Sequence, residues 1–383
     1  MRNLRTLMAT LLIFFVAILG VWIKFLNTAI ITTEPGYTYT VPSGATLKTV
    51  IHDLYQKDII KNPTFLNLLA RMRGAAHELK AGEYLFPKGT TPSTLLNQIT
   101  TGSGLVYHGF TIVPGWNFKE LSDALLKETH LRHTISSLKN DVLMARLGHP
   151  ELNPEGQFFP DTYLFAGGTA DIVVLKNAFK EMQDKLKAAW EKREPGLPYK
   201  NPYEALIAAS LIEKEAYLNE ERPIIAGVLV NRIRKDMLLQ FDPTVIYGMG
   251  LRYVGIINKE NLLEDSPYNT YIHKGLPPTP IAMPSLGSIM AVLHPEHNEY
   301  FYFVARGDGS HQFSRTLIEH NSAVTELRKR LSWEINLSPP TINSWSREIQ
   351  NTVIPAKAGI HSEWIPAFAG MTEWVKLSFR NSY

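Results

Sequence analysis

The chain contains no cysteine among its 383 residues. Disulfide bonds, cysteine nucleophiles and thiolate-bound zinc are therefore excluded, and the composition is compatible with either side of a bacterial membrane. The net charge is only +3, and no long run of lysine and arginine is interleaved with aromatic residues. The sequence thus indicates no nucleic-acid partner. Hydrophobic residues make up 45% of the chain, which is ample for packed cores.

Several common active-site motifs are also missing. No G-x-S-x-G nucleophile elbow occurs, and the glycines that follow Gly248 have the wrong spacing for a dinucleotide site. His294 and His297 are three residues apart, but the proline between them makes helical ligand geometry unfavourable. A polar turn is the preferred interpretation of this pair. The sequence therefore predicts no metal site and no cofactor.

The N-terminus carries a long apolar run. Arg2 and Arg5 precede an uncharged stretch from Thr6 to Ile23, which Lys24 follows. As a helix this stretch spans about 27 Å, close to the hydrocarbon core of a bilayer. No small-residue cleavage site follows it, so a retained anchor (helix about 6–26) is favoured over a cleaved signal peptide. The two arginines predict a cytoplasmic N-terminus (residues 1–27 with the anchor) and place the rest of the chain outside the cytoplasm.

Residues 37–104 are predicted to form a small α+β module. "YTYTVP" alternates as a strand does, two helical patterns follow, and "GEYLF" and a helix starting near Pro92 complete the order. The segment "KAGEYLFPKGTTPSTLLNQI" resembles the LysM-like modules of cell-wall proteins. A spacer domain without a binding role remains the alternative interpretation.

A second α+β domain is predicted over residues 105–335. It contains an amphipathic helix near 170–192 and another helix that starts after Asn201. From Leu239 onward, segments rich in proline, glycine and tyrosine predict loops suited to lining a cleft. Residues 339–383 differ in kind, because they contain a near repeat, "IPAKAGI" and "IPAFAGM". This atypical tail looks like a translated intergenic repeat and is set aside for function.

The stretch "ASLIEKEAYLNEER" holds four glutamates. In a helix that turns about 100° per residue, Glu215 shares a face with Leu211 and Ile212, whereas Glu213 lies about 200° away. A carboxyl group on the apolar side has a raised pKa and suits a general acid. The other glutamates (213, 220 and 221) are predicted to be solvated or ion-paired at the surface. The alternative for Glu215 is a structural carboxylate that pairs with Arg232 or Arg234.

Five segments together resemble the endolytic murein transglycosylases, the MltG or YceG-like family. They are "EGQFFPDTYLF", "AASLIEKEA", "NRIRKDMLLQFDPTVIYGMG", "YNTYIHKGLPP" and "YFYFVARGDGSHQFSRTLIEHN". The resemblance implies a membrane-anchored enzyme with a LysM-like module and a YceG-like catalytic domain. The family's catalytic glutamate falls on Glu215. One departure is Ser285, where relatives often have glycine.

The implied reaction is non-hydrolytic cleavage of the β-1,4 bond between N-acetylmuramic acid and N-acetylglucosamine, with a 1,6-anhydro product. Peptidoglycan strands are the implied substrate, the bacterial inner membrane the implied location, and peptidoglycan synthases are candidate partners. The predicted substrate-binding residues are Asn231, Gln240, Asp242, Thr244, Tyr247, Tyr268, Asn269 and Tyr271. For each of these, hydrogen bonding within the fold is the competing role. A hydrolytic muramidase and a non-catalytic peptidoglycan-binding scaffold are the alternative functions.

Overall fold

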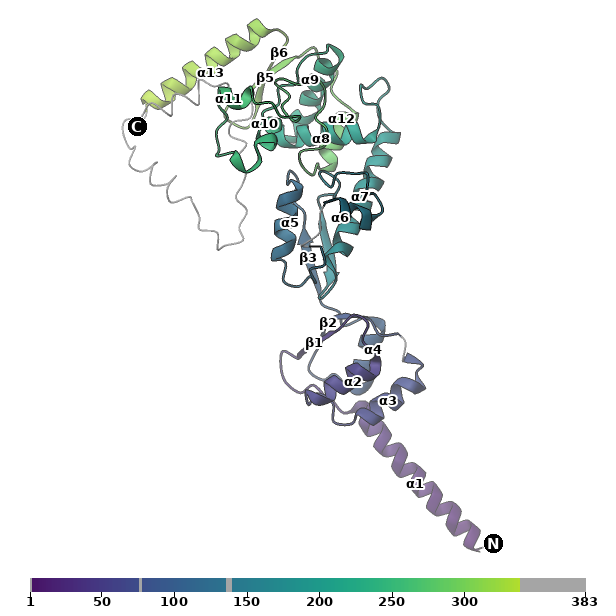
Figure 1. The fold of residues 1–383 in the computed structure, drawn as a ribbon. Helices are drawn as coiled ribbons and strands as arrows, with labels where there is room; N and C mark the ends of the chain where they lie inside the picture. The colour runs from purple at the N-terminus through teal and green to yellow at the C-terminus, as the bar shows by residue number, and fades with distance from the viewer. Residues whose placement is uncertain (1, 76–77, 136–139, 338–383) are drawn as a thin grey trace. The chain divides into compact units, whose positions relative to one another are not determined.

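The computed structural model describes residues 2–75, 78–135 and 140–337. The fold is mixed α+β with an N-terminal apolar helix, as the sequence predicts. The chain divides into two compact units (Figure 1). The first takes in residues 1–111, 123–137 and 162–175, and the second takes in 112–122, 138–161 and the chain from 176 onward. The predicted repeat-derived tail, residues 339–383, lies outside the described residues.

Helix α1 (Arg2–Asn27) is, among the described helices, the one long and apolar enough to cross a membrane. Its apolar side chains from Leu4 to Leu19 are exposed, with Phe14 65% exposed. Near its end, Trp22 and Phe25 pack against the core of the first unit, and both rings contact Phe65 edge-on. The exposed apolar side chains of α1 therefore extend over the part of the helix that the sequence predicts to span the bilayer.

The module after α1 has the predicted order of elements. It consists of β1 (Tyr37–Val41), α2 (Leu47–Gln56), α3 (Pro63–Met72), β2 (Gly82–Phe86) and α4 (Pro92–Thr101). The strands pair antiparallel, with Tyr39 opposite Tyr84. Helix α4 begins where predicted, because Thr91 and Thr94 form a capping box ahead of its first turn. The two helices, α4 and the strand pair enclose a core that includes Leu54, Tyr84 and Phe86. The likeness to LysM modules stays a prediction.

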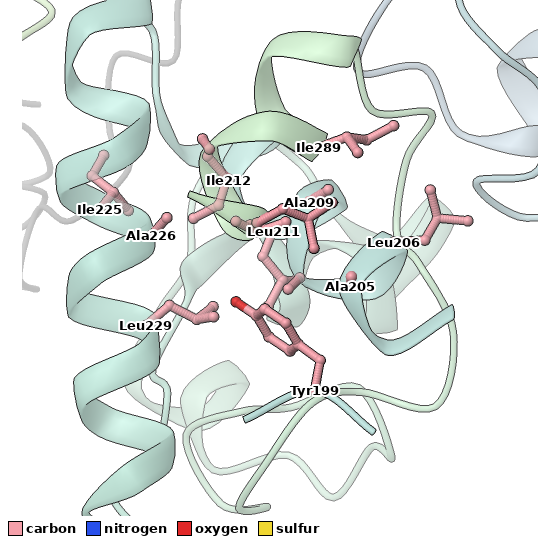
Figure 2. Close-up of a cluster of buried hydrophobic side chains, with 14 of the residues drawn as sticks. Tyr199, Ala205, Leu206, Ala209, Leu211, Ile212, Ile225, Ala226, Leu229 and Ile289 are labelled. Atoms are coloured by element: carbon pink, nitrogen blue, oxygen red, sulfur yellow. The ribbon is translucent and has the colours of Figure 1, made fainter. Parts of the chain in front are cut away.

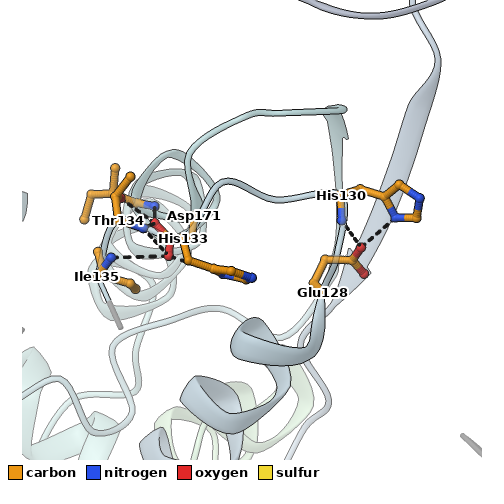
Figure 3. A network of polar contacts seen from close by, with 7 residues as sticks. Glu128, His130, His133, Thr134, Ile135 and Asp171 are labelled. Carbon is orange, nitrogen blue, oxygen red and sulfur yellow. Dashed lines mark hydrogen bonds and ion pairs between the residues drawn. The ribbon is translucent and has the colours of Figure 1, made fainter. Parts of the chain in front are cut away.

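The first unit also contains the antiparallel pair β3 (Tyr107–Thr111) and β4 (Thr162–Ala166). Asp171, the first residue of α7 (Asp171–Glu191), fixes a neighbouring loop (Figure 3). Its buried carboxylate accepts the N–H and hydroxyl of Thr134 and the N–H of Ile135. A separate bond joins His130 to Glu128 at 2.8 Å. A buried carboxylate with several donors is a structural anchor, and it ties residues 134 and 135 to the start of α7.

The second unit is mainly helical. It contains α6 (Asn140–Leu147), α8 (Pro202–Glu215), η2 (Asn219–Glu221), α9 (Arg222–Arg234), α10 (Asp242–Met249), η3 (Gly250–Arg252), α11 (Lys259–Leu262), α12 (Leu286–Leu293), the hairpin β5 (Tyr302–Ala305) and β6 (His311–Ser314), and α13 (Leu317–Leu337). Helix α5 (Phe118–Lys127) is shared, because its residues 118–122 belong to the second unit and 123–127 to the first. The predicted long helix near 170–192 is confirmed by α7. The core lies around α8, against α9 and α12.

One sequence expectation about this unit is wrong. The segment from Leu239 was expected to form loops, yet it contains α10. Pro243 occupies the first turn of α10, where its missing N–H leaves no bond unmade and its fixed φ favours the helix. Three of the predicted sugar contacts therefore lie on a helix: Asp242, Thr244 and Tyr247.

Candidate functional site

Helix α8 brings Glu215 into the interior. Asn201 caps its first turn by accepting the N–H of Glu204 at 3.0 Å, so the helix starts where the sequence predicts. From Ala205 to Ile212 every residue is buried. Figure 2 shows Leu211 and Ile212 of α8 between Leu229 of α9 and Ile289 of α12. Because α8 is buried on all sides, its end is held firmly in the core.

Glu215 is the last residue of α8 and is 3% exposed. Its Oε2 atom is buried and has no hydrogen-bond partner among the described residues. Burial raises the pKa of Glu215 well above its usual range. The charge of Asp242 raises it further, and that of Arg232 opposes both effects. A raised pKa favours the protonated carboxyl group, which can give its proton to a bound substrate.

The three other glutamates were predicted to be solvated or ion-paired at the surface. Glu220 is exposed and Glu213 is ion-paired, as expected, but the side chain of Glu213 is nearly buried and Glu221 is buried. The side chain of Glu213 is 5% exposed and pairs with Arg222 at 3.2 Å. Glu221 is 8% exposed, and its two oxygens accept the N–H and ring Nδ1–H of His311 at 2.9 and 2.6 Å. The helical-face argument fails here because other elements cover the far side of α8. Glu215 differs from Glu213 in its lack of partners rather than in its burial.

Among the described residues, no hydrogen bond supports the alternative role of Glu215 as a structural carboxylate that pairs with Arg232 or Arg234. Arg232 donates through Nε to the carbonyl of Phe301 at 2.6 Å and through Nη1 to that of Leu239 at 2.7 Å. Arg234 donates to the carbonyl of Gly196 at 2.9 Å. Arg232 is buried and close enough for its charge to act on Glu215, but its hydrogen bonds go to backbone carbonyls and to the side chain of Gln240.

Three of the predicted sugar contacts interact electrostatically with Glu215 or form a hydrogen bond with Arg232. They are Asp242, Tyr271 and Gln240. Asp242 begins α10 and accepts a hydrogen bond from the hydroxyl of Tyr271. Burial raises the pKa of Tyr271, and the charges of Asp242 and Glu215 raise it further. Gln240 is exposed and accepts from Arg232 at 3.2 Å. Its φ of +56° is unusual for a residue with a side chain, and such strain clusters at functional sites.

Three others serve the fold itself. The amide of Asn231 donates to the carbonyls of Asn298 and Tyr300 at 2.9 and 3.0 Å. Thr244 is fully buried and donates to the carbonyl of Phe241 at 2.6 Å. Asn269 is 1% exposed, and its amide donates to two backbone carbonyls at 2.9 and 3.0 Å. The competing role, internal hydrogen bonding, accounts for the polar groups of these three side chains.

Tyr247 and Tyr268 form a second polar patch, around a residue that the sequence analysis missed. Their rings lie 4.7 Å apart, and the hydroxyl of Tyr247 donates to Glu155 at 2.9 Å. Glu155 is 3% exposed and also accepts the N–H of Phe118 at 3.0 Å. Burial raises the pKa of Glu155 to about 7, although both donors lower it. Glu155 opens the segment "EGQFFPDTYLF", which the sequence analysis used only for the family resemblance.

The histidines at 294 and 297 lie in the turn between α12 and β5, as predicted. His297 pairs with Glu194 at 3.0 Å and is 80% exposed. Within residues 2–75, 78–135 and 140–337, no group of three or more histidine, aspartate and glutamate side chains could hold a metal ion.

A sequence model of the YceG-like family matches residues 39–326. An endolytic murein transglycosylase of Bacillus subtilis (strain 168) is 31% identical over 306 residues, which cover 74% of this chain and 82% of that protein. One from Streptococcus pneumoniae serotype 2 is 26% identical, with 76% of this chain and 58% of that protein covered. A crystal structure of a YceG-like protein from Listeria monocytogenes has 27% identity and a TM-score of 0.47, covering 76% of this chain and 99% of that one. The chain therefore belongs to the YceG-like family.

Proposed function

We propose that the protein is a membrane-anchored endolytic lytic transglycosylase that cleaves peptidoglycan glycan strands. One observation carries the proposal: Glu215, a buried carboxyl group with an unpartnered oxygen, ends a helix that is packed in the core. Its position matches the catalytic glutamate that the family resemblance implies. Relatives at 31% and 26% identity bear the name endolytic murein transglycosylase, which supports the same substrate for this chain.

The chemistry follows from a single carboxyl group. Glu215 gives its proton to the glycosidic oxygen as the bond from C1 of N-acetylmuramic acid breaks and positive charge develops at C1. The 6-hydroxyl of the same sugar then attacks C1, and the Glu215 carboxylate takes the hydroxyl proton. The proton count balances, and no water is consumed. Because the nucleophile belongs to the substrate, intramolecular attack replaces an activated water.

Glu215→Gln tests this role, because it preserves the shape of the side chain and removes the transferable proton. We expect the release of 1,6-anhydro products to fall by at least about 100-fold while glycan binding persists. Glu220→Gln is the matched control, since Glu220 lies on the same stretch and is exposed. Mass spectrometry of the products separates the candidates. Reducing-end products from the wild type would identify a muramidase, and an unaltered cellular function in Glu215→Gln would identify a scaffold.

We further propose that α1 is a retained anchor in the inner membrane, with the N-terminus in the cytoplasm and the catalytic unit outside. The support is the exposed apolar surface of α1 and the arginines that precede it. Because the chain has no cysteine, Glu220→Cys creates a single labelling site. A membrane-impermeant maleimide should label it in intact spheroplasts. Protection until lysis would reverse the topology, and a mature N-terminus beyond residue 27 would show a cleaved signal.

A further inference from the structure

The second unit has one buried carboxyl group at the C-terminal end of a helix and another at the N-terminal end of a different helix. Glu215 is the last residue of α8, and Asp242 is the first residue of α10. They are 3% and 7% exposed. The C-terminal end of a helix carries partial negative charge and disfavours a carboxylate, whereas the N-terminal end favours one. The backbone alone thus biases Glu215 toward the neutral form and Asp242 toward the charged form.

Hydrogen bonding also favours the charged form of Asp242 and the neutral form of Glu215. The hydroxyl of Tyr271 donates to Oδ1 of Asp242, and a donor of this kind stabilises a carboxylate. Oε2 of Glu215 receives no donor from the described residues. When the surroundings favour the protonated form of one carboxyl group and the ionised form of another, the two groups usually have different roles in a site.

The titratable groups that interact with Glu215 come from three other segments. They are the charged Asp242 on α10 and Arg232 on α9, and Tyr271 in the segment after α11. Burial keeps the pKa of Tyr271 well above its usual range, so its phenol stays neutral. Arg232 is held by backbone carbonyls and cannot turn to neutralise Asp242 without losing those bonds.

We propose that Asp242 is a second, ionised carboxylate of this site. It is a positioning residue that acts through Glu215, because its charge controls how strongly Glu215 holds its proton. It does not contact the sugar. The inference rests on the proposed role of Glu215. Before the reaction, the negative charge of Asp242 keeps the proton on Glu215. After the proton has passed to the glycosidic oxygen, the same charge makes the Glu215 carboxylate a stronger base toward the 6-hydroxyl. One fixed charge therefore serves both proton transfers.

Asp242→Asn tests the proposal, because asparagine keeps an oxygen for the Tyr271 hydroxyl and removes the charge. The titration of Glu215 is followed by NMR in the full chain with ¹³C-labelled glutamate carboxyl groups, and Glu215→Gln assigns the signal. We expect the Glu215 midpoint to move to lower pH in Asp242→Asn. Asp236→Asn is the control, since Asp236 is exposed and pairs with Lys274. An unmoved midpoint in Asp242→Asn overturns the proposal.

Kinetics give a second, independent measurement. In Asp242→Asn, the alkaline limb of the pH–rate profile should move to lower pH with KM little changed. A raised KM with an unmoved limb is the result for a sugar contact and also overturns the proposal. Should Asp242→Asn fail to fold, Tyr271→Phe keeps Asp242 but removes its donor, and the limb should move the same way by a smaller amount. The NMR titration needs no activity, so it still decides the role of Asp242 if the proposed lytic reaction is absent.

Discussion

Ser285 donates both its N–H and its hydroxyl to one carboxylate oxygen of Glu213, at 2.8 and 2.6 Å. The same hydroxyl accepts a bond from Arg222 at 3.0 Å. Ser285 also caps the first turn of α12. The contact therefore joins the end of α8, the start of α9 and the start of α12 within one unit. It holds the helix end on which Glu215 stands, and it occupies the position where the family resemblance leads one to expect glycine.

Ser285→Gly should lower the stability of the second unit. The variant loses a hydrogen bond to a buried charged acceptor and the side chain that caps α12, which together cost about 1 to 2 kcal/mol. Thermal unfolding of the full chain in detergent measures the loss. Ser285→Thr retains the hydroxyl and should remain close to the wild type. Equal melting temperatures for Ser285→Gly and the wild type would show that the Glu213 contact adds no stability.

Glu155 should make stability depend on pH. Its folded-state pKa of about 7 lies above that of an unfolded glutamate, about 4.3. The protonated form therefore contributes stability that is fully present below about pH 4.3 and lost as the pH rises through about 7. The melting temperature of the wild type relative to Glu155→Gln should fall across this window. A difference that is constant with pH would contradict the raised pKa.

Tyr247→Phe should destabilise the protein more at alkaline than at acid pH. The lost hydroxyl donates to Glu155 and favours its charged form, so the bond is worth most when that carboxyl is ionised. Bonds to charged acceptors contribute about 1.5 to 3 kcal/mol. Urea unfolding at about pH 8 and about pH 5 provides the comparison. Tyr217→Phe is the control, because Tyr217 is 62% exposed, and a larger effect at acid pH would refute the assignment.

Asn201→Ala should weaken the start of α8 without altering chemistry at its other end. The substitution removes the side-chain acceptor for the N–H of Glu204 and costs about 1 kcal/mol. Melting temperature should drop, whereas the rate of anhydro-product release per folded molecule should not change. A lower rate at full folding would mean that the cap also sets the position of Glu215.

Local sequence determined the elements that carry this site. Asn201 with Pro202 marks the start of α8, and the spacing of apolar residues marks α1, α7 and the elements of the 37–104 module, because caps and hydrophobic periods act within a few residues of the chain. The loop prediction failed at α10, where one proline in a first turn outweighed the abundance of loop-forming residues around it.

The tertiary structure alone decided which carboxyl group is free to react. Glu213, Glu215 and Glu221 lie within nine residues of chain, and the side chains of all three are largely buried. Their partners Ser285 and His311 come from segments 72 and 90 residues away, which no local pattern reveals. Because a buried carboxylate is stabilised only by the donors that reach it, those distant contacts separate the two structural glutamates from Glu215.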